Sequence, residues 1–267
     1  MRAIINSETL KYVQIGKKGS GISLVFLHGS TMTKGGMLPL AKMFPEFNCI
    51  CFDLTAHGKS RGQVPEEISD LSKAVEASIS TLQYNKIIDK KIVLLGYSMG
   101  GAIVFDIAWR KQIDLMGMVI LSSGSDLKNF TPLVDELKNM PPEQFKASDI
   151  LQHLFGKNTP EEEQKKISDI FMETKVDDLI GYNDLMISNA YNQLEKCNEI
   201  SIPTLLVHGS DDKIVLPGAG IATWKRIKDS ELLIVPYKGH AAIYEDTNVV
   251  TDKVKEFVHY TIQMGLV

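Results

Sequence analysis

The stretch 92-IVLLGYSMGGA-102 decides the fold of this chain. Its first four residues, Ile92–Leu95, are apolar and predict a buried strand, and the pattern from Met99–Lys111 predicts a helix. The turn between them is Gly-Tyr-Ser-Met-Gly, with Ser98 at its centre. A serine on so sharp a strand-to-helix turn needs small neighbours two residues away, because the strand and the helix nearly touch there. Gly96 and Gly100 leave that space, so the pattern predicts a nucleophilic serine rather than a simple glycine-rich turn.

The alternation of strand and helix continues on both sides of this turn. Further apolar runs, each followed by Gly, Asp or Asn, predict strands over Ser23–Leu27, Cys49–Leu54, Met116–Leu121, Thr204–Val207 and Glu231–Val235. Helices are predicted over Met37–Phe44, Glu66–Gln83, Ala219–Lys228 and Asn248–Met264. Several of the strands are apolar throughout, which indicates burial on both faces. We therefore predict an α/β fold with a mostly parallel central sheet flanked by helices.

The alternation breaks once, between residues 127 and 200. No strand is predicted there, and short amphipathic helices take over. One of them has a start signal, in which Thr159 caps the helix, Pro160 takes its first position and Glu162 completes a capping box. We predict a helical cap at 127–200 and a core built from 1–126 and 201–267. The cap is expected over the carboxyl edge of the sheet, where open α/β sheets bind ligands.

The composition limits the classes of protein to which this chain can belong. Apolar residues make up 44% of the chain and charged residues 23%, as in ordinary globular proteins. The net charge of −4 comes without a basic cluster, so no nucleic-acid partner is expected. No apolar run is long enough for a bilayer, and residues 1–11 lack a signal-peptide pattern, so no membrane partner is expected. Cys49 and Cys51 lie two apart on one predicted strand and would not easily bridge. We expect a cytoplasmic monomer or homodimer.

A nucleophilic serine needs a base and an acid. His240 lies on a loop after the last predicted strand, close to the final helix, and is the candidate base. The base needs an anionic partner that fixes its tautomer. The chain order Ser…Asp…His of this fold places that partner before His240. Asp212 is the first candidate, with its neighbour Asp211 and the earlier Asp126 as alternatives.

An attacked carbonyl also needs hydrogen-bond donors for the oxygen that becomes negative. The backbone N–H of Met99, directly after the serine, is one candidate. The second is expected from the loop after an early strand, where Ser30 is the candidate and Thr31 the alternative. No Cys/His cluster has the spacing of a zinc site, so no metal or other cofactor is expected.

Taken together, the motifs resemble the α/β-hydrolase superfamily, specifically its small capped, esterase-like members. His28-Gly29-Ser30 is similar to the oxyanion-loop motif, and residues 53–60, DLTAHGKS, resemble the D-x-x-G-H-G-x-S turn with Ala56 in place of glycine. Residues 96–100 resemble the nucleophile elbow and residues 239–240 the histidine turn. Residues 209–212, GSDD, resemble the G-x-x-D acid turn, and for this reason Asp212 is preferred. The resemblance runs from about residue 24 to 245 and leaves the cap out.

The resemblance implies a serine hydrolase that acts on a small ester or related acyl substrate. Ser98, His240 and Asp212 would be catalytic, with the amides of Met99 and Ser30 as the oxyanion hole. Two other readings stay open: a carbon–carbon hydrolase or menaquinone-pathway-like synthase of the same fold, and a slow-turnover ligand sensor. The synthase elbow expects arginine where this chain has Ala102, which counts against that reading. Six cap side chains could line a pocket, although packing is the preferred role for each: Phe145, Phe155, Phe171, Met172, Met186 and Tyr191.

Overall fold

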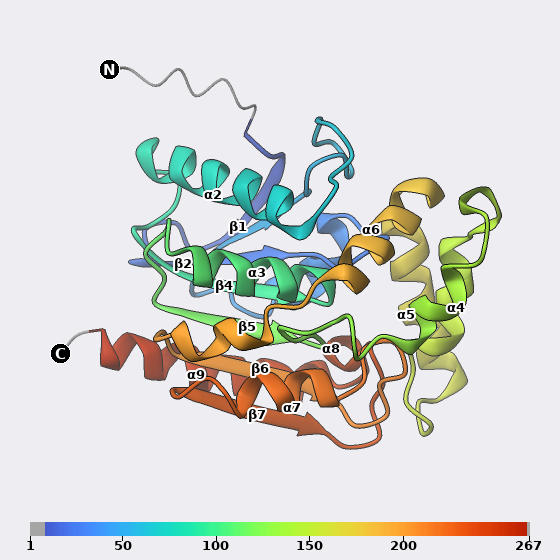
Figure 1. Cartoon of the computed structure of the whole chain (residues 1–267). Coiled ribbons are helices and arrows are strands. Elements are labelled where there is room, and N and C mark those ends of the chain that lie inside the picture. The colour runs from blue at the N-terminus through green and yellow to red at the C-terminus, as the bar shows by residue number, and fades with distance from the viewer. Residues whose placement is uncertain (1–8, 266–267) are drawn as a thin grey trace.

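The computed structural model describes residues 9–265 and has at its centre a seven-stranded sheet (Figure 1). Its strands are β1 (Tyr12–Gly16), β2 (Ile22–Leu27), β3 (Asn48–Phe52), β4 (Lys91–Tyr97), β5 (Gly117–Leu121), β6 (Thr204–Gly209) and β7 (Ser230–Val235). They lie in the order β1-β3-β2-β4-β5-β6-β7, and all neighbours are parallel except β1 and β3. The predicted fold class is confirmed.

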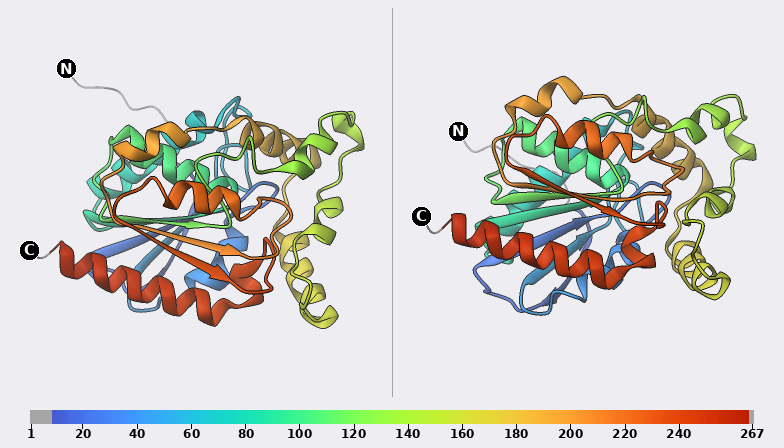
Figure 2. Two further views of the ribbon diagram at one scale, coloured as in Figure 1. Left: turned by 60° about the horizontal axis from the view of Figure 1, so that its bottom comes forward. Right: turned by 90° about the horizontal axis from the view of Figure 1, so that it is seen from below.

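Helices cover both faces of this sheet. They are α1 (Leu38–Ala41), α2 (Ile68–Tyr84), α3 (Met99–Arg110), α7 (Gly218–Trp224), α8 (Ala242–Glu245) and α9 (Thr247–Met264), with the 3-10 helix η1 (Lys34–Met37) before α1. Figure 2 shows α9 along one face, with α2, α3 and α7 on the other. None of the helices within residues 9–265 is both long and apolar enough to cross a membrane.

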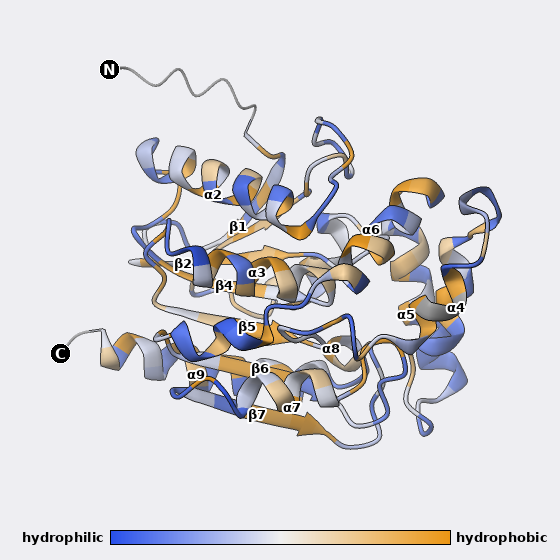
Figure 3. Ribbon diagram, in the orientation of Figure 1, coloured by the Kyte–Doolittle hydropathy of each residue, from blue (hydrophilic) through white to orange (hydrophobic). Residues whose placement is uncertain are grey.

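Strand β1 has no counterpart among the predicted strands. It pairs antiparallel with β3 at the edge of the sheet, and its residues are only partly buried. A half-exposed edge strand carries mixed residues such as Tyr12-Val13-Gln14, and it therefore lacks the continuous apolar signature of the central strands. The buried strands β2, β3, β4 and β5 are apolar enough to be found from sequence alone (Figure 3).

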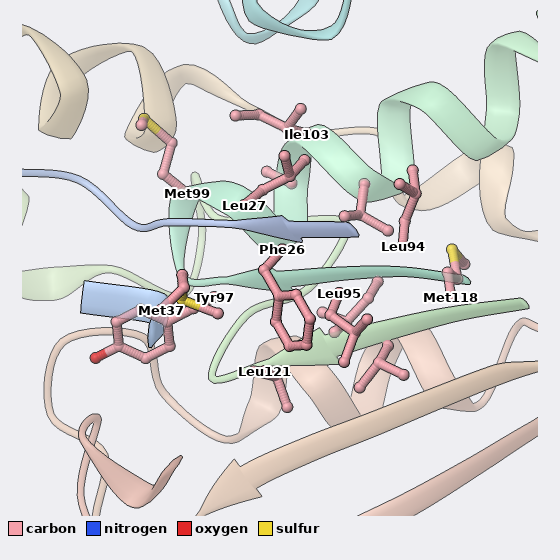
Figure 4. Close-up of a cluster of buried hydrophobic side chains, with 14 of the residues drawn as sticks. Phe26, Leu27, Met37, Leu94, Leu95, Tyr97, Met99, Ile103, Met118 and Leu121 are labelled. Atoms are coloured by element: carbon pink, nitrogen blue, oxygen red, sulfur yellow. The ribbon is translucent and has the colours of Figure 1, made fainter. Parts of the chain in front are cut away.

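The core packs β2, β4 and β5 against α3. Figure 4 shows buried side chains on both faces of the sheet, with Leu27, Leu94 and Ile103 on the side of α3 and Phe26, Leu95 and Leu121 on the opposite side. The chain runs from β2 outward to β3 and then returns to place β4 on the other side of β2. Ligands bind open α/β sheets at the carboxyl ends of strands where the strand order reverses in this way. The loops after β2 and β4 are thus neighbours at the expected site.

Residues 127–200, which we call the cap, connect β5 to β6. They form α4 (Pro132–Leu137), η2 (Pro142–Gln144), η3 (Ala147–His153), α5 (Glu161–Thr174), α6 (Asp178–Ala190) and η4 (Leu194–Glu199). Helices α4, α5 and α6 gather beyond one end of the sheet (Figure 1). The predicted start of α5 is wrong by one residue, since Pro160 is the N-cap and no side chain caps the helix. The Thr159 hydroxyl donates instead to the buried Glu245 carboxylate of the core.

Candidate active site

Ser98 occupies the turn between β4 and α3 in a backbone conformation that few residues adopt. Its φ is +52° and its ψ is −119°, a strained combination typical of functional sites. A Cβ on Gly96 would lie 2.1 Å from the carbonyl oxygen of Gly100, and one on Gly100 would lie 2.4 Å from that of Leu27. Only glycine fits at either position. The Ser98 N–H donates to Leu121 O at 2.9 Å, which ties the turn to the neighbouring strand.

Three loops that are far apart in the chain meet at this turn in a hydrogen-bonded row. Ser98 Oγ lies 3.0 Å from His240 Nε2, and His240 Nδ1 lies 2.8 Å from Asp212 Oδ2. His240 follows β7 and Asp212 follows β6, so the two loops reach the same edge of the sheet as the serine. The ring of Tyr97 packs on the His240 ring at 5.2 Å between centroids, and the Tyr97 hydroxyl donates to His240 O. The geometry places a base within reach of the serine and a carboxylate behind the base.

The Asp212 carboxylate is buried, and both of its oxygens accept hydrogen bonds. Its Oδ1 accepts hydrogen bonds from the N–H groups of Ile214 at 2.9 Å and Val215 at 3.0 Å. Burial alone would raise the pKa of this carboxyl, but the charge of His240 and hydrogen bonds from His208 and His240 outweigh it and lower the pKa to about 2. Asp212 is therefore ionised across the pH range of any ordinary assay.

The two alternative acids lie elsewhere. Asp211 points away from the row, where its carboxylate accepts from the hydroxyl of Ser210 and the N–H of Lys157. Asp126 is buried at the start of the cap, and both its oxygens accept from Asn129. Of the three aspartates, the structure brings only Asp212 to His240.

His208 is a member of this cluster that the sequence did not predict. Its Nε2 lies 2.7 Å from Val215 O and 3.1 Å from Asp212 Oδ2. Asp212 thus faces two imidazoles, that of His208 at the end of β6 and that of His240 in the loop after β7. A histidine at a strand end carries no local signal for this contact, because the contact depends on how the following loop folds back.

The two predicted donors, the backbone N–H groups of Ser30 and Met99, donate to no acceptor within the described residues. The loop that carries Ser30 touches the elbow, since a Cβ on Gly29 would lie 3.1 Å from Ser98 Cβ. The alternative donor Thr31 is excluded, because its N–H donates to Asp184 Oδ2 at 3.0 Å. Both predicted donors remain available for a negatively charged oxygen.

The turn after β3 hydrogen-bonds to Lys34, which follows the Ser30 loop. Asp53 accepts from the N–H and the ammonium group of Lys34 and from the N–H of Lys59. Burial works against the charge of Asp53, but these hydrogen bonds outweigh it and lower the pKa of the carboxyl. Ala56, which stands where the resemblance expects glycine, adopts a φ of +66°. The departure from the family motif is thus accommodated with the left-handed backbone that glycine would have supplied.

A narrow, mostly apolar cavity of about 30 Å³ opens onto Ser98 and His240. This is room for only a few water molecules. Of the six cap side chains named above, Phe171 and Met172 line the cavity, whereas the other four do not. Lys175 is the single charged residue among the described residues that line it. No group of His, Cys, Asp and Glu able to hold a metal ion occurs in residues 9–265.

Known proteins resemble this chain over nearly its whole length. A proline iminopeptidase of Saccharolobus solfataricus is 27% identical, with 94% of this chain and 89% of the relative covered. A 2-hydroxy-6-oxononadienedioate/2-hydroxy-6-oxononatrienedioate hydrolase of Klebsiella pneumoniae is 26% identical, with 88% and 86% covered. Among solved structures, a lipase-esterase related protein of Clostridium acetobutylicum superposes with a TM-score of 0.82 at 27% identity, covering 94% of this chain and all of that one.

These relatives differ in the bonds that their names say they cleave, so they agree on a fold and a hydrolytic class rather than on a substrate. Residues 21–247 match the family described as serine aminopeptidase, S33. On that match the chain belongs to this family of the α/β-hydrolase superfamily and is a hydrolase of the α/β fold.

Proposed function

We propose that the protein hydrolyses a small carboxylic ester through an acyl-enzyme formed on Ser98. The row from Ser98 Oγ through His240 to Asp212, at 3.0 Å and 2.8 Å, is the observation that carries this proposal. A base within hydrogen-bond reach of a hydroxyl, itself oriented by a third group, is the arrangement that activates a serine nucleophile.

In the first half of the proposed reaction, Ser98 Oγ attacks the ester carbonyl carbon while His240 Nε2 takes the serine proton. The carbonyl oxygen becomes negative and accepts from the N–H groups of Met99 and Ser30. The C–O bond then breaks, and His240 returns its proton to the departing alcohol. In the second half, water gives a proton to His240 and attacks the acyl carbon. The bond from that carbon to Ser98 Oγ then breaks, His240 returns the proton to Ser98 Oγ, and the acyl group leaves as a carboxylic acid. Asp212 stays ionised throughout and stabilises the imidazolium.

The cavity supports a small and mainly apolar acyl group. Its lining includes Ile150, Leu151, Leu154 and Leu185 from the cap, together with Ile214 from the core. Its volume is far below that of a drug-sized ligand site, roughly 300–1,000 Å³. Binding of an ester therefore requires cap side chains to shift, and short acyl chains need the smallest shift.

The proposal is tested with a fluorophosphonate probe and a series of p-nitrophenyl esters from acetate to decanoate. We expect stoichiometric labelling of Ser98 and turnover that is fastest for short chains. Labelling with negligible turnover of every ester would identify a sensor instead of an esterase. Absence of labelling in folded protein would refute the assignment of Ser98 as nucleophile.

A second candidate reaction is cleavage of a carbon–carbon bond next to a ketone in an anionic substrate. Lys175 lines the cavity, and its ammonium group, which lies 3.3 Å from Asp178 Oδ1, would pair with a substrate carboxylate in this reaction. The variant Lys175→Met separates the two reactions. It should leave neutral esters within about twofold of the wild-type rate, while any activity on keto acids or on half-esters of dicarboxylic acids should fall about tenfold or more, a loss typical of one charge-assisted contact.

A further inference from the structure

A second buried histidine–carboxylate pair connects the cap to the core beside the candidate active site. Asp184, on α6, accepts from His57 Nε2 at 2.9 Å, and both side chains have no exposed surface. The other ring nitrogen of His57, Nδ1, lies 2.7 Å from Thr55 O. Both nitrogens therefore face oxygen atoms, an arrangement that favours His57 as an imidazolium paired with the Asp184 carboxylate.

The same Asp184 oxygen holds the loop that carries the candidate oxyanion donor. It accepts from Thr31 N–H at 3.0 Å, and Thr31 directly follows Ser30. Thr31 has a φ of +66°, a conformation that is strained for a β-branched residue. Its carbonyl oxygen accepts from Val176 N–H at 3.0 Å, and Met32 bridges to Lys175. Every one of these contacts reaches Thr31 or Met32 from the cap.

We propose that Asp184 is a positioning residue, through which the cap holds the Ser30–Thr31 loop in the conformation that aims the Ser30 N–H at the reacting carbonyl oxygen. The proposal rests on the ester hydrolysis proposed above. A strained residue keeps its conformation only when its surroundings impose it. Without the carboxylate, Thr31 is expected to relax towards extended backbone and to turn the preceding peptide groups away from Ser98.

The test compares three substitutions. Asp184→Leu keeps the approximate shape and removes both hydrogen bonds. Asp184→Asn keeps one acceptor oxygen for Thr31 N–H but removes the charge that faces His57. Asp126→Asn is the matched control, because Asp126 is a buried carboxylate directly before the cap whose hydrogen bonds go to Asn129 and not to the active site.

Activity per competent site is measured after titration with the fluorophosphonate, so that unfolded protein does not count. We expect kcat to fall about 100-fold for Asp184→Leu, the lower end of the range for loss of one oxyanion donor. For Asp184→Asn, which keeps an acceptor for Thr31 N–H, we expect a smaller fall of about 10-fold. KM should stay within about threefold. Affinity for an alkyl boronic acid, which forms a tetrahedral adduct with the serine, should fall in parallel with kcat/KM, and affinity for the planar carboxylic acid product should not. Asp126→Asn should leave all four quantities unchanged.

Hydrogen exchange tests the positioning role of Asp184 independently of turnover. Peptides that cover residues 28–33 should exchange faster in Asp184→Leu, while those that cover the elbow at 96–101 should not. Unchanged exchange at 28–33, or a kcat per labelled site equal to that of the wild type, would overturn the proposal. If the wild type neither labels nor hydrolyses esters, the proposed function fails, and the exchange result still decides whether Asp184 holds the loop.

Discussion

The core edge and the cap supply the candidate active site in different ways. The core contributes groups from loops that each follow a strand, such as Ser98, Asp212 and His240, and the sheet fixes where these loops start. The cap contributes walls and supports, such as Phe171 and Asp184, whose places depend on how helices pack over the edge. The difference predicts that changes at the core edge remove the chemistry, whereas changes in the cap adjust its rate and its substrate range.

The largest effect is expected from Ser98→Ala. Loss of the hydroxyl removes the nucleophile, so ester turnover should fall by roughly 10⁴–10⁶-fold and fluorophosphonate labelling should vanish. Steady-state rates and intact-mass measurement of the labelled protein check both outcomes. Because the side chain is nearly buried and alanine is smaller, the fold should persist, which circular dichroism verifies. Residual hydrolysis within tenfold of the wild-type rate would contradict the assignment of Ser98 as the nucleophile.

A nearly equal effect is expected from Asp212→Asn, and almost none from its neighbour. Asparagine cannot orient His240 or stabilise its charged form, so kcat should fall about 10⁴-fold. Asp211→Asn is the matched control, because within residues 9–265 the hydrogen bonds of the Asp211 carboxylate go to Ser210 and Lys157 and not to His240. Its kcat should stay within about twofold. Equal losses of kcat in the two variants would contradict the assignment of Asp212, and not Asp211, as the partner of His240.

The buried pair between cap and core should make stability depend on pH. Burial lowers the pKa of His57, but the charge of Asp184 and the hydrogen bonds that the ring donates to Asp184 and Thr55 O outweigh it, and the pKa is raised above its ordinary value near 6.5. A raised folded-state pKa contributes stability that is full below about pH 6.5 and is lost as the pH rises through the folded value. Wild type should exceed Asp184→Asn by about 2 kcal/mol at pH 5.5 and by less at pH 8.5 in urea unfolding.

Two other groups face His57 and enter this comparison. The His28 ring lies 5.0 Å away, and burial together with the charge of His57 lowers the pKa of His28 to about 3. His28 is therefore neutral in the folded protein and costs stability as the pH falls below about 6.5, in the wild type and the variant alike. The charge of Asp53 also raises the pKa of His57, and Asp184→Asn leaves Asp53 unchanged. If the difference in unfolding free energy between the wild type and Asp184→Asn grows as the pH rises, His57 is neutral in its pair with Asp184.

What the sequence could predict follows the same division between core edge and cap. The elbow glycines, the strand-end loops and the chain order of Ser98, Asp212 and His240 are local or ordered signals, and each led to the residue that the structure brings to the site. The His57–Asp184 contact joins residues 127 positions apart and arises from the packing of the cap on the core, which no single stretch encodes. The His208–Asp212 contact spans only four positions, but it depends on how the loop after β6 folds back. Strand β1 was missed because an edge strand needs no continuous apolar run.

The smallest effect is expected from Met172→Ala, which tests whether the cap sets the acyl-chain range. Met172 lines the cavity yet is 40% exposed, so its removal should widen the space above Ser98 at little cost in stability. We expect kcat/KM for octanoate relative to butyrate to rise about threefold to tenfold, since each added methylene that finds room contributes roughly 0.8 kcal/mol. The matched control is Met264→Ala, an exposed methionine on α9 outside the cavity, which should not change the ratio. An unchanged ratio in Met172→Ala would show that this side chain does not limit the acyl-chain length, and that the other apolar residues of the cavity wall set the limit.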